Sequence, residues 1–354
     1  MPGRRRSLVA YKGISGKASG EENTRFSFSK AGLPSMTTGP RPDFFIVGAP
    51  KCGTTSLNAY LSAHPAIFMA RKEQHFFGSD LADIWPQPTA SLYFGSFAGS
   101  ASAARRGEAS GWYLRSRLAA EEIHAYDSRA QIIAILRNPV EMLPSYHSQC
   151  LWRGWETIQD FGEALAAESD RRNGRRIPRM NGDNPWRLLY RDVVRFYEQI
   201  ERYFSVFGKN QVSVLLFDDL VERPAETYKS VLEFLGVDSN FAPNFGVLNA
   251  NKYNRSRLVR RAVDVVWEPS PRVRRIARRF VPVQPMRRAM MSHVALPVRR
   301  ANTRIAPRPP IDAQLRQRLA AEFAPDVHRL GVLLGRDMTH WCAPGASRAT
   351  DGSA

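Results

Sequence analysis

Short apolar runs alternate along the chain with longer segments in which apolar residues recur at every third or fourth position. The runs are typical of buried strands and cover residues 44–47, 67–69, 131–136 and 211–217. The segments with helical spacing cover residues 54–64, 116–126, 186–207, 224–235 and 312–334. Strands that alternate with helices predict an α/β fold, in which a central parallel sheet is flanked by helices on both faces.

The turn after the first apolar run predicts a site for an anion. Gly48 and Gly53 lie between the strand and the next helix, where backbone N–H groups lack helical partners and point outward with the positive end of the helix dipole. A nucleoside-triphosphatase loop has Lys directly after the second Gly, whereas this chain has Thr54 there and carries Lys51 before that Gly. The spacing therefore favours an anion loop of another kind over a kinase-like P-loop or an ordinary glycine turn.

A second polar segment, residues 71–77, holds a carboxylate and an imidazole two positions apart. Glu73 and His75 follow a cationic pair and precede Phe76 and Phe77, which we expect to pack in the core. Transfer of a group to an alcohol or amine needs a base for the attacking proton, and a positioned base contributes about 10²- to 10⁴-fold in rate. The segment is a candidate for that base, the alternative being a solvated charged loop.

An arginine follows the buried run 131–136. In open α/β sheets ligands lie beyond the carboxyl ends of the strands, so Arg137 is placed to meet one. An Arg fork matches a phosphate in geometry as well as charge, and Ser145 can add a hydroxyl donor. A structural ion pair is the alternative for Arg137. Its position after a phosphate loop favours the binding role.

Together these segments resemble the sulfotransferases that use 3′-phosphoadenosine-5′-phosphosulfate (PAPS), especially bacterial and glycosaminoglycan-type members. The resemblance implies that the phosphosulfate is gripped by Lys51, Cys52, Gly53, Thr54, Thr55 and Ser56. It implies that Arg137 and Ser145, in an R-[ND]-P-x-x-x-x-x-S pattern, bind the 3′-phosphate. The segment K-E-Q-H-F-F is similar to the family's K-E-x-H-F-F, which implies that Glu73 is the catalytic base, with His75 as the alternative.

The resemblance also implies a P-loop-like sheet and a reaction without metal, in which Lys51 stabilises the leaving oxygen. Residues 107–113 are similar to the family's G-E-x-S-P-x-Y, with two departures. Ala109 stands where glycosaminoglycan-type members have a second active-site Lys, and Gly111 stands where Pro is usual. The candidates for the missing charge are Arg71, Lys72 and Arg115. Residues 333–341 resemble the closing L-L-G-R-D-x-[ST]-x-W of bacterial members.

The net charge of +18 is concentrated in two stretches. Residues 1–41 hold eight Lys/Arg against two Glu, and residues 255–310 hold fifteen Arg against one Asp and one Glu. We therefore expect a disordered basic tail (1–41), a sulfotransferase core (42–254), a basic helical insertion (255–310), a C-terminal core helix (311–342) and a second tail (343–354). The insertion could contact an anionic membrane surface or acceptor, or be a solvated helical face.

Three cysteines are too few for a disulfide framework, and no apolar stretch is long enough for a signal peptide or a membrane span. We expect a cytoplasmic protein, with membrane contact at most peripheral. The predicted reaction moves a sulfuryl group from PAPS to a hydroxyl or amine, with carbohydrate favoured as the acceptor and nucleic acid disfavoured as a partner. The rival hypotheses are a P-loop kinase-like phosphotransferase and a non-enzymatic protein that binds polyanions or membranes.

Overall fold

The computed structural model describes residues 39–246, 252–256, 258–259, 296–306, 308 and 310–343. All of them fall within one unit, Thr37–Ala354. The tails 1–38 and 344–354 and most of the basic stretch 255–310, including Arg257, Arg260, Arg261 and Arg272, lie outside the described residues. The structure therefore leaves the predictions for the tails and for most of that stretch as predictions.

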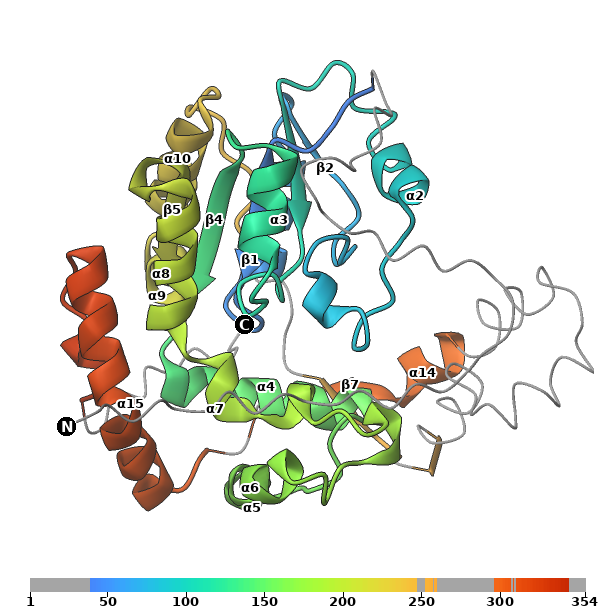
Figure 1. The fold of residues 1–354 in the computed structure, drawn as a ribbon. Coiled ribbons are helices and arrows are strands. Elements are labelled where there is room, and N and C mark those ends of the chain that lie inside the picture. Colours follow the sequence, from blue (N-terminus) through green and yellow to red (C-terminus); the bar gives the residue numbers. More distant parts are fainter. Residues whose placement is uncertain are drawn as a thin grey trace, which may run out of the picture. The chain divides into compact units, whose positions relative to one another are not determined.

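A five-stranded parallel sheet forms the centre of the fold, with the strand order β2-β3-β1-β4-β5 (Figure 1). Its strands are β1 (Phe44–Gly48), β2 (Ile67–Met69), β3 (Arg105–Ala109), β4 (Gln131–Leu136) and β5 (Val212–Leu216). All five residues of β1 are buried, as expected for an apolar run at the middle of a sheet covered on both faces. The predicted α/β fold with a central parallel sheet is confirmed.

The connections between the strands explain why helices cover both faces. The chain leaves β1 toward β2 in one direction and leaves β3 toward β4 in the other, and right-handed crossovers put the two connecting helices on opposite faces. On one face α1 (Thr54–Ser62) packs with α10 (Pro224–Leu235), where the Tyr228 hydroxyl donates to the Tyr60 carbonyl at 3.1 Å. On the other, α3 (Ala119–Tyr126) packs with α8 (Phe196–Phe207).

Most of the remaining helices surround the carboxyl edge and the β5 side of the sheet, whereas α2 (Ala90–Gly95) lies on the β2 side (Figure 1). Figure 1 shows α4 (Pro139–Arg153) lying across the carboxyl edge, toward which the strands point. A second, antiparallel sheet consists of β6 (Lys252–Asn254) and β7 (Thr303–Ile305). It is bonded to Trp152 of α4, because Asn254 donates to the Trp152 carbonyl and the Trp152 indole N–H donates to Thr303 Oγ1. The remaining helices are α2 (Ala90–Gly95), α4 (Pro139–Arg153), α5 (Phe161–Ala166), α6 (Glu168–Arg172), α7 (Tyr190–Val193), α9 (Phe217–Glu222), α14 (Leu296–Asn302) and α15 (Ala313–Leu334).

Two expectations about local structure were wrong. The single long helix over residues 186–207 is divided into a 3₁₀ turn (Trp186–Leu188), α7 and α8. The Leu188 carbonyl accepts from Arg171 at 3.3 Å and the Arg191 N–H donates to Glu168 at 3.0 Å, so tertiary contacts take backbone groups that a continuous helix would pair internally. Residues 78–107, for which the sequence pattern predicted no strand or helix, contain α2 and the start of β3.

Candidate functional site

A cavity of about 700 Å³ lies beyond the carboxyl ends of the strands, a volume within the range of small-molecule sites. Adjacent strands β1 and β4 continue in opposite directions across the sheet, and ligands of open α/β sheets bind at such a switch point. The cavity brings together nearly all residues that the sequence singled out: Lys51, Gly53, Thr54, Thr55, Ser56, Glu73, His75, Arg137 and Ser145. Among the residues predicted to bind PAPS or act as the base, Cys52 is the exception, because its buried thiol donates to the Pro50 carbonyl at 3.5 Å and does not line the cavity.

The loop between β1 and α1 presents an open helix N-terminus to the cavity. Gly53 caps α1 with φ = 91°, and a Cβ there would lie 2.9 Å from Leu220 Cδ2, so the turn requires glycine. Within the described part of the chain, no side chain caps this helix end and its first turn holds no acidic residue. The free N–H groups and the helix dipole therefore suit an anion.

Arg137 enters the cavity from the end of β4. Its guanidinium lies 4.5 Å from the centre of the Phe217 ring, which limits the directions it can take. Asn138 caps α4 by accepting from the Val140 N–H at 3.0 Å, and the helix then carries Ser145 to the same cavity. The strand end and the following helix thus place a guanidinium and a hydroxyl on one wall.

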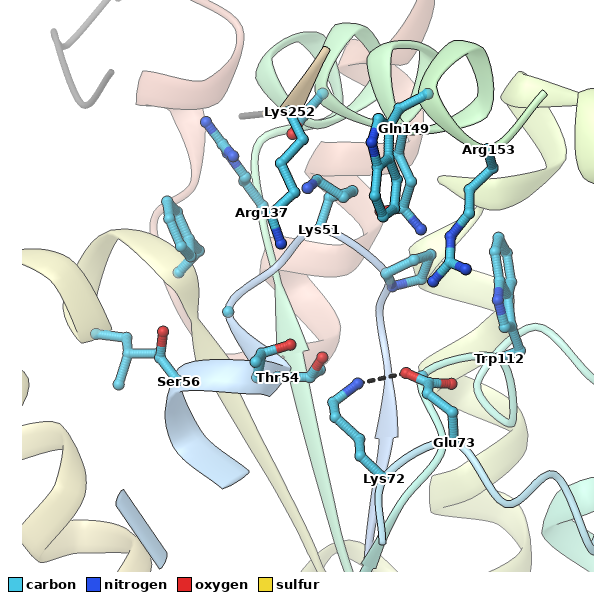
Figure 2. A pocket seen from close by; sticks show the side chains of 18 of the residues that line it. Lys51, Thr54, Ser56, Lys72, Glu73, Trp112, Arg137, Gln149, Arg153 and Lys252 are labelled. Atoms are coloured by element: carbon cyan, nitrogen blue, oxygen red, sulfur yellow. Dashed lines mark hydrogen bonds and ion pairs between the residues drawn. The ribbon is translucent and has the colours of Figure 1, made fainter. Parts of the chain in front are cut away.

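Lys51 lies in a region of strongly positive potential. Burial, together with the nearby charges of Arg308, Arg137 and Lys252, lowers the pKa of Lys51 to about 8. Figure 2 shows Lys51, Arg137 and Lys252 gathered on one side of the cavity. So many cations in one partly buried place favour a ligand with several negative charges.

The polar segment after β2 lies elsewhere in the cavity. Glu73 forms an ion pair with Lys72 through Oε1, and its Oε2 lies 3.2 Å from His75 Nε2. The His75 ring stacks on Trp85 with 4.8 Å between ring centres, and its Nδ1 has no hydrogen-bond partner among the described residues. Burial lowers the pKa of His75, and the Glu73 carboxylate opposes that shift. Phe76 and Phe77 are buried in the core, as predicted.

The three candidates for the charge absent at Ala109 lie in different surroundings. Lys72 lines the cavity beside Glu73, whereas Arg71 is exposed and does not line it. Arg115 is buried 3.9 Å from the Trp186 ring centre and donates to the Trp186 carbonyl at 2.7 Å. Only Lys72 of the three therefore reaches the cavity.

Several lining residues escaped the sequence analysis. Lys252 and Arg308 come from the edges of the basic stretch, and four tryptophans line the cavity: Trp85, Trp112, Trp152 and Trp155. Arg153, at the end of α4, extends toward the side where Glu73 lies (Figure 2). Gln149, Trp152 and Arg153 follow Ser145 by four, seven and eight positions. Residues at this spacing lie on the same face of a helix as Ser145, so the sequence could have predicted that they line the cavity.

The described residues contain neither a cluster of metal-binding side chains nor a membrane-spanning helix. No group of three or more His, Cys, Asp or Glu side chains in this part of the chain could hold a metal ion. Within the same residues, no helix combines the length and the apolarity needed to cross a bilayer.

Comparisons with known proteins find relatives among the sulfotransferases. Human carbohydrate sulfotransferase 15 is 26% identical over 55% of this chain and 44% of its own length. Human bifunctional heparan sulfate N-deacetylase/N-sulfotransferase 2 is 25% identical over 55% of this chain and 22% of its own. The chain thus spans less than half the length of these curated relatives.

A solved structure and a family model are similar to a larger part of this chain than the two curated relatives are. The crystal structure of a sulfotransferase from Alicyclobacillus acidocaldarius superposes with a TM-score of 0.60 and 27% identity, covering 86% of this chain and all of the other. The model of the sulfotransferase domain matches residues 41–252. Because that match covers more than half of the 354 residues, the chain belongs to the sulfotransferase family.

Proposed function

We propose that this protein transfers a sulfuryl group from PAPS to a hydroxyl or amine of a carbohydrate acceptor. The observation that carries the proposal is the common cavity of Lys51, Arg137 and Glu73, at the switch point of the sheet. Two of these groups are cations suited to a doubly phosphorylated nucleotide, and the third is a carboxylate that can take a proton.

The carrier would be bound through fixed positive groups. In this proposal the N–H groups and hydroxyls of residues 53–56 hold the phosphosulfate, and Arg137 with Ser145 holds the 3′-phosphate. The stack of Arg137 on Phe217 supports the second role, because a guanidinium held in one direction is ready for a bidentate phosphate contact. Lys252 and Arg308 add positive charge beside Lys51.

The chain's own residues then divide the work of an in-line transfer. Glu73 takes the acceptor proton, and Lys51 stabilises the charge that grows on the leaving oxygen. Lys72, which forms an ion pair with Glu73, places a positive charge near the sulfuryl oxygens. It thereby replaces the second active-site Lys that other members carry at the position of Ala109. His75 holds the second Glu73 oxygen and is the alternative base.

A carbohydrate acceptor is supported by the names of the relatives and by the tryptophans of the cavity, which offer flat apolar faces to a sugar ring. Screening polysaccharide pools with radiolabelled PAPS would identify the acceptor. A cytoplasmic location and a peripheral membrane contact through residues 255–310 stay predictions.

The carrier assignment is tested by nucleotide binding to an Arg137→Ala variant. Removing a charged hydrogen bond costs roughly 1.5–3 kcal/mol, so the Kd for adenosine 3′,5′-bisphosphate should rise about 10- to 100-fold. The Kd for adenosine 5′-phosphate should change less than about threefold, since that ligand lacks the 3′-phosphate. Arg129→Ala is the control, because Arg129 is 93% exposed and outside the cavity. Equal losses for both nucleotides in Arg137→Ala would remove the 3′-phosphate assignment.

A further inference from the structure

The segment that carries Glu73 and His75 lies against β3 and the turn that follows it. The Glu73 N–H donates to the Ala109 carbonyl at 2.7 Å, and the His75 N–H donates to Ser110 Oγ at 3.1 Å. The N–H groups of Phe76 and Phe77 both donate to the Tyr113 hydroxyl, at 2.8 and 3.2 Å. Backbone groups of the segment are thus held one after another by residues 109–113.

Both hydroxyls in this set are themselves held by one buried carboxylate. Ser110 Oγ donates to Glu108 Oε1, and the Tyr93 hydroxyl donates to Glu108 Oε2 at 3.2 Å. The Tyr113 hydroxyl interacts with the same carboxyl and lowers its pKa. Glu108, Ser110 and Tyr113 are all fully buried, and none of them lines the cavity. Burial raises the pKa of Glu108 to about 7. The ionised carboxylate only accepts, so Ser110 Oγ turns its hydrogen toward Glu108 and a lone pair toward the His75 N–H.

The conformation that these bonds hold is an unfavourable one. Glu73 and His75 have φ values of 64° and 52°, in the left-handed region that non-glycine residues rarely occupy. Such a backbone persists only where the surroundings fix it, and here it directs the Glu73 carboxylate into the cavity. Loss of the bonds would let the segment relax and carry the base away from the acceptor.

We infer that Glu108, Ser110 and Tyr113 are positioning residues, which orient the Glu73 base through the backbone of residues 73–77 without touching the substrate. The inference rests on the proposed function, because it assigns these residues to the same transfer. It also explains why the G-E-x-S motif and Tyr113 accompany the K-E-Q-H-F-F segment in one chain.

The test compares Ser110→Ala and Tyr113→Phe with Tyr190→Phe. Tyr190 is a matched control, because its buried hydroxyl donates to the buried carboxylate of Glu156 at 2.8 Å but does not reach the segment. The first two variants should lower kcat for sulfate transfer about tenfold or more, toward the full contribution of a base, and leave the Kd for adenosine 3′,5′-bisphosphate within about twofold. Tyr190→Phe should change neither value. A kcat loss equal to that of the control would overturn the inference.

A second measurement needs no acceptor. In the folded protein His75 is stacked on Trp85 and faces Glu73, Lys72 and Arg187, with its pKa lowered by burial. Titration of the His75 imidazole by NMR, assigned with a His75→Gln variant, should show its pKa rising toward the ordinary value in Ser110→Ala and Tyr113→Phe but not in Tyr190→Phe. An unchanged His75 titration in all three would overturn the inference. If the wild type transferred sulfate to no acceptor, the proposed function would fail while this titration still decided whether the segment is held in place.

Discussion

Three residues that line the cavity combine a chemical group with a rare backbone conformation. Of the four non-glycine residues with positive φ in the described part of the chain, Lys51, Glu73 and His75 lie in the site, with φ values of 64°, 64° and 52°. Each such residue costs about 1–3 kcal/mol, and the surrounding fold must supply that free energy. The side chains are thereby oriented before any ligand arrives, which lowers the cost of ordering them during the reaction.

The assignment of the base is tested by Glu73→Gln. Glutamine keeps the size of the side chain but cannot take a proton, so the rate of transfer should fall by about 10²- to 10⁴-fold. The Kd for adenosine 3′,5′-bisphosphate should stay the same, because the proposed nucleotide contacts come from cationic and N–H groups and not from Glu73. Single-turnover rates with an identified acceptor measure the loss. An unchanged rate would move the role of base to His75.

The lowered pKa of Lys51 predicts how carrier binding depends on pH. The pKa in the free protein is about 8, below the ordinary 10.5, so Lys51 is charged below pH 8 and increasingly neutral above it. A bound bisphosphate favours the charged form and raises this pKa. The Kd for adenosine 3′,5′-bisphosphate should therefore increase, by up to about tenfold per pH unit, as the pH rises from 8 to 9.5.

The matched variant for this titration is Lys51→Arg, whose guanidinium keeps its charge through the whole range. Its Kd should be nearly flat between pH 7 and 9.5 when measured by calorimetry. The same linkage has an opposite effect on the free protein, since the unfolded chain binds more protons than the folded one between pH 8 and 10.5. The Lys51 contribution to folding stability thus becomes more favourable as the pH rises through that window. A slope in the Lys51→Arg protein equal to that of the wild type would assign the pH dependence to another group.

At the scale of elements, the sequence predicts best where burial alone decides the structure. The runs 67–69 and 131–136 form β2 and β4 with the predicted bounds. β4 lies inside the sheet, where an apolar run has few alternatives, and β2 is an edge strand whose first residue, Ile67, is buried. β3 was missed because it begins with Arg105 and Arg106. Arg105 Nε pairs with Asp43 at 2.7 Å, and the Arg106 N–H donates to the same carboxylate. Because Asp43 is distant in the sequence, the local pattern of residues does not reveal these contacts.

In the site, too, the sequence predicts residues placed by local structure and misses those placed by long-range contacts. Motif residues such as Lys51, Glu73 and Arg137 were found because their chemistry is tied to a local turn or strand end. Lys252 and Arg308 reach the cavity through β6 and the chain after β7, and their placement depends on a small sheet that no local pattern predicts. Residues delivered by distant segments become visible only in the folded chain.

At the scale of the whole molecule, the C-terminal segment links two strand ends of the site. The Trp341 carbonyl accepts from Asn138 Nδ2 at 3.1 Å, and the indole N–H donates to Asp218 Oδ2 at 2.8 Å. Arg336 pairs with Asp219 at 2.8 Å. Asn138 directly follows Arg137, and Asp218 directly follows Phe217, on which Arg137 stacks. The closing motif of the sequence thus bonds to the neighbours of Arg137 and Phe217 from some two hundred residues away, and we expect these bonds to position Arg137.

Cutting these links should weaken carrier binding while the protein stays folded. Trp341→Phe keeps the aromatic ring and the carbonyl bond but loses the indole donor, and Arg336→Ala removes the ion pair. Each link is a partly exposed polar contact worth about 1 kcal/mol, so each variant should raise the Kd for adenosine 3′,5′-bisphosphate by about three- to tenfold. The turnover rate at saturating PAPS should be unchanged, because Glu73 and Lys51 keep their places. Arg329→Ala is the control on α15, the helix that precedes this segment, since it loses a pair with Asp326 and a contact with the Tyr197 ring, neither of which lines the cavity. If Trp341→Phe and Arg336→Ala bound the bisphosphate as tightly as Arg329→Ala, the C-terminal segment would stabilise the fold without positioning Arg137.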